Sequence, residues 1–181
     1  KHGPLSVGLA CEVIFQAANG LGHAMEKGMV HRDIKPANLL LNQDPGEDVV
    51  QVKILDFGLV REVARSGPTM SGVTFGTPEY MAPEQAMGKT IDGRADLYAL
   101  GIIMYECLVG FPPFDGADSF SVSYKQVHEP AVPPTEVSSR VPAALSEIVM
   151  RCLAKTPKDR FARGYDLADA LIAFLRTIPE S

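Results

Sequence analysis

Apolar residues recur every four positions close to the N-terminus, at Leu9, Val13, Ala17, Leu21 and Met25. This spacing aligns their side chains along one face of an α-helix. We predict a helix over residues 6–27. Pro4 suits its entry, and Gly28 suits its exit because glycine adopts the left-handed conformation of a helix end at low cost.

Four later segments also have helical patterns. Residues 94–109 include the most apolar stretch of the chain, which indicates a buried helix, and a glycine and two prolines follow it. A weaker pattern covers residues 119–127, before a proline-rich connector at 129–134. Residues 142–154 begin with proline, which is favoured at the first helical position. Residues 165–176 carry one apolar face.

Two short apolar runs, 39–41 and 49–55, flank a turn-rich stretch and predict a β-hairpin. The segment that follows, residues 56–84, is rich in glycine and proline, and a loop of that length in a compact domain is usually functional or mobile. The sequence therefore predicts a mainly α-helical domain with one small hairpin.

Composition narrows the classes of function. The chain has 181 residues, 46% of them apolar, which suffices for one domain with a single core. Its net charge of −5, from 17 basic and 22 acidic residues, argues against nucleic-acid binding. The most apolar stretch, residues 97–105, is shorter than the roughly 20 residues of a membrane span, and no signal-peptide pattern is present.

The three cysteines, Cys11, Cys107 and Cys152, are far apart and form no Cys-x-x-Cys pair. They are typical of buried thiols in a reducing compartment. We therefore expect a cytoplasmic segment with no membrane contact of its own.

Polar residues of a distinct kind gather in two loops that the hairpin brings together. Asp33, Lys35 and Asn38 precede its first strand, and Asp56 follows its second. Amide and carboxylate oxygens such as those of Asn38 and Asp56 suit Mg²⁺, which keeps water ligands and bridges phosphates. Lys35 can offset charge on a transferring phosphoryl group, and Asp33 can orient a hydroxyl and accept its proton. This set indicates phosphoryl transfer to an alcohol.

Three motifs occur in order: His-Arg-Asp within residues 31–38, Asp-Phe-Gly at 56–58, and Gly-Thr-Pro-Glu-Tyr through Ala-Pro-Glu at 76–84. Each is weak alone, and their joint occurrence is what makes the signal strong. On these residues the chain resembles the eukaryotic-type (Hanks-type) serine/threonine protein kinases, in the style of bacterial members. The resemblance runs from residue 1 to about residue 176. It implies the C-terminal lobe of a protein kinase-like fold.

The resemblance also assigns roles. It implies that Asp33 is the catalytic base, that Lys35 neutralises the γ-phosphate of ATP and that Thr77 contacts both. Asn38 and Asp56 would hold Mg²⁺, and Leu40 would pack under the adenine. A lysine two residues after the catalytic aspartate is similar to the serine/threonine branch, so the implied partner is a protein substrate modified at serine or threonine.

Further matches concern support of the site. Asp96 is similar to the aspartate that anchors the catalytic loop, and Arg160 to the arginine that pairs with the glutamate of Ala-Pro-Glu, here Glu84. The resemblance also implies that His31 and Phe57 stack as internal support.

Residues between 56 and 84 could carry regulation. In the family, the arginine before the catalytic aspartate, here Arg32, often pairs with a phosphate on this segment. The candidate acceptors are Thr69, Ser71 and Thr74. Ala37 departs from kinases that prefer basic substrates, which often carry an acid there.

The sequence contains no Gly-x-Gly-x-x-Gly loop and no Val-Ala-Ile-Lys strand before the catalytic loop. We therefore expect residues 1–181 to be the C-terminal lobe without the N-terminal ATP-binding lobe, and to be inactive alone. Apolar surface left open around the hairpin would favour self-association. Resemblance to bacterial members allows a membrane anchor of the parent protein outside this segment.

Three other readings compete. A pseudokinase-like interaction module would keep the fold, but such modules tend to lose the set that Asp33, Lys35, Asn38 and Asp56 form here. A small-molecule kinase would lack the peptide-receiving segment at 76–84. A non-enzymatic helical scaffold would leave the three ordered motifs as an accident.

Overall fold

The computed structural model describes residues 3–43, 50–57 and 77–178. Its longer helices are α1 (Val7–Glu26), α3 (Arg94–Val109), α4 (Ser119–His128), α6 (Ala143–Cys152) and α7 (Gly164–Leu175). Its short helical turns are η1 (Pro36–Asn38), η3 (Pro78–Tyr80), α2 (Pro83–Ala86), α5 (Pro134–Val137) and η4 (Pro157–Asp159). Strands β1 (Leu39–Gln43) and β2 (Val50–Ile54) complete the described part.

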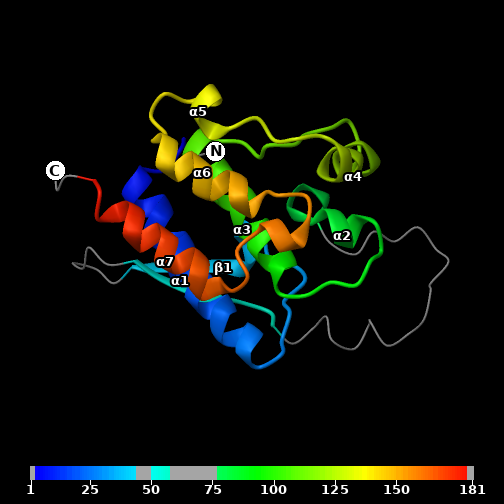
Figure 1. Ribbon diagram of the computed structural model, residues 1–181, viewed down its shortest axis with the longest axis horizontal. Helices are drawn as coiled ribbons and strands as arrows, with labels where there is room; N and C mark the ends of the chain where they lie inside the picture. Colours follow the sequence, from blue (N-terminus) through cyan, green and yellow to red (C-terminus); the bar gives the residue numbers. More distant parts are fainter. Residues whose placement is uncertain (1–2, 44–49, 58–76, 179–181) are drawn as a thin grey trace.

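Helix α3 is the centre of the fold, with α1 and α7 on one side and α2 and α4 on the other (Figure 1). Nearly all of its residues are buried, as its largely apolar sequence predicts. Helices α1 and α7 pack closely at Gly164, because glycine has no Cβ. A Cβ there would collide with the backbone of α1 at Ala18 and Gly22. The core also contains Cys11 and Cys152, which are buried as predicted, while Cys107 is only partly buried.

Two glycines end helices as the sequence predicts, whereas Ser6, which was predicted to lie inside the first helix, is its N-cap. The Ser6 hydroxyl accepts the backbone N–H of Leu9 at 3.2 Å and caps α1. Gly28 follows α1 with φ of 68°, and Gly110 ends α3 with φ of 97°. Both are left-handed conformations in which a β-carbon would be strained, so glycine is the residue that fits.

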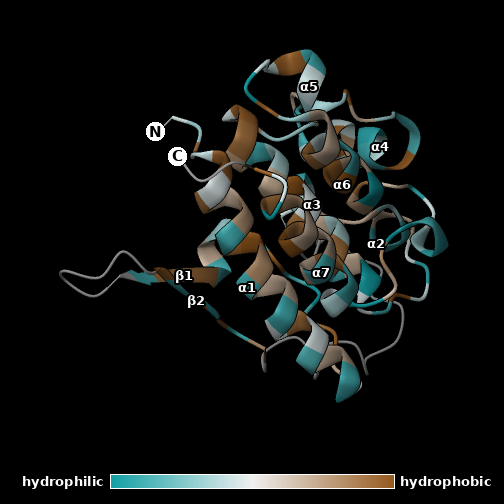
Figure 2. Cartoon of the chain, turned by 60° about the vertical axis from the view of Figure 1, so that its left-hand side comes forward, coloured by the Kyte–Doolittle hydropathy of each residue, from teal (hydrophilic) through white to brown (hydrophobic). Residues whose placement is uncertain are grey.

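The two strands pair antiparallel, with Leu39 opposite Ile54, and the hairpin lies beside α1 at one edge of the helical body (Figure 2). Gln16 of α1 fixes it by accepting the N–H of Val52 at 2.9 Å and donating to the carbonyl of Val50 at 2.7 Å. One side of β2 therefore packs on the helix. Large apolar side chains remain exposed on the hairpin and just after it, at Leu40, Leu41 and Leu55.

The structure corrects three boundaries. The helix predicted over 142–154 spans Ala143–Cys152, with Pro142 as its N-cap. The segment 56–84 was predicted as loop throughout, but its described end contains η3 and the start of α2, and the connector at 129–134 runs into α5. These short turns each begin with proline, whose fixed φ suits a first helical position. Among the described residues, no helix is both long and apolar enough to cross a membrane.

Candidate active site

Asp96 of α3 fixes the start of the loop at residues 31–38, which leads into β1. Its two carboxylate oxygens accept the backbone N–H groups of His31 at 2.8 Å and Arg32 at 2.9 Å. Burial raises the pKa of Asp96 to about 6, and the two backbone donors partly oppose the rise. A carboxylate on the central helix thus takes up two loop N–H groups that would otherwise be buried without a partner.

His31 joins the loop at residues 31–38 to the end of β2. Its Nε2 donates to the carbonyl of Leu55 at 2.7 Å, and its Nδ1 accepts the N–H of Asp33 at 3.2 Å. Only the neutral tautomer with the proton on Nε2 makes both bonds. The ring also meets Phe57 edge to face, with centroids 4.8 Å apart. The predicted support by His31 and Phe57 is confirmed as a contact.

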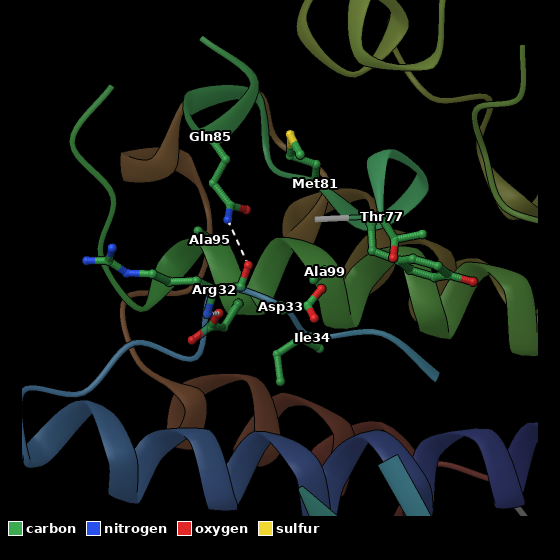
Figure 3. A pocket seen from close by; sticks show the side chains of 10 residues that line it. Arg32, Asp33, Ile34, Thr77, Met81, Gln85, Ala95 and Ala99 are labelled. Carbon is green, nitrogen blue, oxygen red and sulfur yellow. Dashed lines mark hydrogen bonds between the residues drawn. The ribbon is translucent and has the colours of Figure 1, made fainter. Parts of the chain in front are cut away.

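Two residues of the site adopt the left-handed backbone region that non-glycine residues rarely occupy. They are Arg32, with φ of 72°, and Asp56, with φ of 63°. Gln85 of α2 holds the first by donating from Nε2 to the Arg32 carbonyl at 3.0 Å, as Figure 3 shows. Such strain persists only where surrounding contacts over-determine it, and here bonds from Asp96 and Gln85 hold the strained peptide on both sides.

Three of the predicted polar residues, Asp33, Lys35 and Asn38, meet in one cluster with Thr77. Lys35 Nζ lies 3.3 Å from Asp33 Oδ2 and 3.4 Å from Thr77 Oγ1. Asn38 Nδ2 donates to the Asp33 carbonyl at 2.8 Å and lies 3.4 Å from Asp33 Oδ2. Asp33 is therefore contacted by the ammonium and the amide, and Thr77 joins the cluster from the far end of the segment 56–84.

The residue types Asn38 and Asp56 also suit a divalent cation whose other ligands are phosphate and water. Asn38 donates its amide nitrogen to the Asp33 carbonyl, so its amide oxygen is the side-chain atom that would bind a cation. The Leu55 N–H donates to the Asn38 carbonyl at 2.9 Å, which places Asp56 next to this end of the hairpin. Within the described ranges no three His, Cys, Asp or Glu side chains form a metal site by themselves. One amide and one carboxylate suit Mg²⁺, which takes few protein ligands.

Leu40 lies on β1 with 48% of its side chain exposed. No contact within the described residues joins Asp56 to the Asp33 cluster. The candidate phosphorylation sites Thr69, Ser71 and Thr74 lie outside the described residues.

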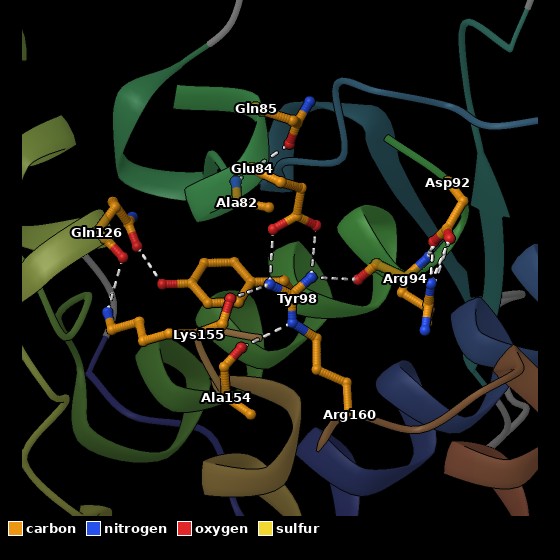
Figure 4. Close-up of polar contacts among 10 residues, drawn as sticks. All are labelled: Ala82, Glu84, Gln85, Asp92, Arg94, Tyr98, Gln126, Ala154, Lys155 and Arg160. Atoms are coloured by element: carbon orange, nitrogen blue, oxygen red, sulfur yellow. Dashed lines mark hydrogen bonds and ion pairs between the residues drawn. The ribbon is translucent and has the colours of Figure 1, made fainter. Parts of the chain in front are cut away.

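A buried ion pair anchors α2, which follows Thr77 and η3 in the chain (Figure 4). Arg160 binds Glu84 through two parallel bonds of 2.7 Å, and both side chains are almost fully buried. Its three other N–H groups donate to the carbonyls of Ala154, Arg94 and Lys155. All five donors of the guanidinium are used, which is the condition under which a buried arginine is tolerated.

Sequence reasoning missed three residues that hold the surroundings of the site in place: Gln85, Gln126 and Lys155. Lys155 Nζ donates to the Gln126 carbonyl at 2.8 Å and lies 4.2 Å from the centre of the Phe114 ring. Burial, with Arg160 nearby, lowers the pKa of Lys155 to about 8. The only sequence signal for Gln126 is a polar residue four positions after Val122, on the buried face of α4.

The comparisons with known proteins agree with this geometry. The profile of the Protein kinase domain family matches residues 1–171. Serine/threonine-protein kinase PknB of Mycobacterium tuberculosis is 37% identical over 173 residues, covering 94% of this chain and 27% of PknB. Serine/threonine-protein kinase Pkn1 of Myxococcus xanthus is 43% identical over 160 residues, covering 88% and 23%. The chain thus spans about a quarter of these relatives.

A solved structure agrees as well. The kinase domain of Mycobacterium tuberculosis PknI superposes with a TM-score of 0.68 at 28% identity, covering 94% of this chain and 57% of that one. With a family profile matched over nearly its whole length, and with bacterial serine/threonine kinases as relatives, this chain belongs to the protein kinase family.

Proposed function

We propose that the protein containing this chain transfers the γ-phosphoryl group of ATP to serine or threonine hydroxyls of proteins. The observation that carries the proposal is the cluster in which Lys35 Nζ lies within 3.4 Å of both Asp33 and Thr77. A carboxylate beside an ammonium, next to a segment that can receive a peptide, is what such a transfer requires.

Asp33 orients the substrate hydroxyl and accepts its proton as the hydroxyl oxygen bonds to the γ-phosphorus. The bond from that phosphorus to the β–γ bridging oxygen breaks, and ADP leaves. Lys35 lies on the same side as Asp33 and stabilises the negative charge on the transferring group. Bound Mg²⁺ would supply charge neutralisation of the phosphates, and Asn38 and Asp56 are the residues that would hold it.

The proposed substrate class follows from Lys35 and Thr77. Their contact at 3.4 Å bridges the catalytic loop and the segment that ends in η3. A serine or threonine side chain is short, so its hydroxyl reaches Asp33 only if the substrate backbone lies close to this bridge. The residue types at these positions are those of the serine/threonine branch that the sequence resembles.

The test is phosphate transfer by the full-length protein, purified and given Mg-ATP with general serine/threonine protein substrates. We expect phosphate on serine or threonine and none on tyrosine, identified by mass spectrometry. The same digests report any modification at Thr69, Ser71 or Thr74. If the well-folded protein transfers phosphate neither to several protein substrates nor to itself, the result would favour an interaction module without kinase activity.

We further propose that residues 1–181 form the C-terminal lobe of a two-lobed kinase domain. The chain matches only 57% of the PknI kinase-domain chain, and its sequence has no glycine-rich phosphate loop. Leu40, the proposed floor of the adenine site, is 48% exposed. The same exposed hairpin side chains support self-association of this segment when it is isolated.

A polypeptide of these 181 residues should therefore bind Mg-ATP weakly, because only part of the nucleotide site would contact the ligand. Isothermal titration calorimetry is the measurement, and we expect no saturable binding below millimolar ATP. The full-length protein, titrated in parallel, is the positive control. Micromolar binding by the 181-residue polypeptide would contradict the two-lobe proposal.

A further inference from the structure

Helix α4 packs against the peptide-receiving segment through an unusual residue. Only Val122 and Gln126 of this helix are buried, and Gln126 has no exposed surface. The outward side of α4 carries the exposed rings of Phe120 and Tyr124. A glutamine is seldom fully buried, so its amide group needs an explanation.

The oxygen and the nitrogen of the Gln126 amide both have partners, and Figure 4 shows the bond to Tyr98. Its Oε1 accepts the hydroxyl of Tyr98, and burial raises the pKa of that phenol, so the hydroxyl keeps its proton. Its Nε2 donates to the carbonyls of Pro78 at 3.2 Å and Glu79 at 2.9 Å. A primary amide, with one acceptor oxygen and an NH₂ group that carries two donors, matches this set of bonds.

Gln126 is itself held firmly in place. Lys155 Nζ donates to its backbone carbonyl at 2.8 Å. The ring of Tyr98 lies 4.8 Å from the guanidinium carbon of Arg160, whose carboxylate partner is Glu84. The amide thus lies between the Tyr98 hydroxyl and the backbone of η3.

The two carbonyls that Gln126 binds lie directly after Thr77. In η3 the Tyr80 N–H donates to the Thr77 carbonyl at 3.0 Å, and the Met81 N–H donates to the Pro78 carbonyl at 3.3 Å. A shift of Pro78 and Glu79 would therefore move Thr77 away from Lys35, a contact that is already 3.4 Å long.

We propose that Gln126 is a positioning residue for the protein substrate, holding the Thr77–Tyr80 segment in register with Lys35 and Asp33. The proposal rests on the proposed kinase function. Loss of the two amide bonds should raise the KM for the protein substrate roughly tenfold. The KM for ATP and the slow hydrolysis of ATP without protein substrate should stay within about twofold.

The experiment compares Gln126→Met with Tyr98→Phe in the full-length protein. Gln126→Met keeps the side-chain volume and leaves the Pro78 and Glu79 carbonyls without their donors. Tyr98→Phe removes the hydroxyl bond to the same amide but leaves those two donors in place. If Gln126 matters only for stability, both variants lose stability, and in neither does the KM for protein substrate change while the KM for ATP stays the same. Gln126→Glu, which keeps an acceptor for Tyr98 and removes the donors, replaces Gln126→Met if that variant fails to fold.

Hydrogen exchange of the Tyr80 and Met81 amides gives a second readout that needs no kinase activity. We expect faster exchange in Gln126→Met or Gln126→Glu and no change in Tyr98→Phe. A selective rise in protein-substrate KM with faster exchange supports the proposal. Equal KM values and equal exchange in all variants overturn it. If the wild type transfers no phosphate, the proposed function fails, and the exchange rates alone decide whether Gln126 positions η3.

Discussion

Replacing Asp33 with asparagine is expected to lower kcat of the full-length protein about 10²- to 10⁴-fold, the range that general-base catalysis supplies. The amide has nearly the shape of the carboxylate but cannot accept the hydroxyl proton. The Asn38 bond to the Asp33 backbone carbonyl, at 2.8 Å, does not depend on the changed group. Binding of ATP and the free energy of unfolding should therefore change little. Initial rates at saturating Mg-ATP and protein substrate measure the effect.

Asp115→Asn is the matched control for this substitution. Asp115 is exposed and lies 3.6 Å from Lys125, so the same chemical change is made away from the catalytic loop. Its rate should equal that of the wild type. An Asp33→Asn protein that is folded and retains more than about a tenth of wild-type kcat would exclude Asp33 as the base.

Replacing Arg160 with methionine is expected to lower the free energy of unfolding by about 3–5 kcal/mol, the effect of breaking a buried ion pair. Glu84 is 5% exposed, so its carboxylate would remain buried without a countercharge. The carbonyls of Ala154, Arg94 and Lys155 would also lose their donor. Removing one partner is therefore much more costly than the net contribution of the pair itself.

Urea unfolding of the full-length protein, followed by a signal from the kinase domain, measures this loss. Asp115→Asn again serves as control, because an exposed ion pair contributes about 0–1 kcal/mol. The double variant Glu84→Met with Arg160→Met should recover part of the loss, since it removes the unpaired charge. A loss below about 1 kcal/mol in Arg160→Met alone would show that water replaces the guanidinium and that the pair is not buried in solution.

The parts of the fold that follow from short-range patterns could be predicted from the sequence. The stripe from Leu9 to Met25 located α1, and Gly28 and Gly110 located two helix ends. The meeting of Asp33, Lys35 and Asn38 follows from a loop of six residues leading into a hairpin. These arrangements depend on neighbours in the chain, where propensity and pattern carry information.

Support from distant parts of the chain could not be derived in this way. Asp96 is 65 positions from His31, and Arg160 is 76 positions from Glu84. Both were expected only because the sequence resembles a family. Gln126 was not expected at all, because its spacing of four from Val122 indicates only a buried position and not the groups that a buried amide would bind. Its bonds exist only once α3, α4 and η3 are packed together.

The burial of the native thiols makes this part of the protein suited to site-specific labelling. Burial raises the pKa values of Cys11 and Cys152 to about 12, and that of Cys107 to about 11. Their reactive thiolate forms are therefore scarce at neutral pH. A single Phe120→Cys substitution, at a side chain that is 77% exposed, would place one fast-reacting thiol on α4. A maleimide fluorophore there could follow the arrival of a protein substrate while the three native cysteines stay in the chain.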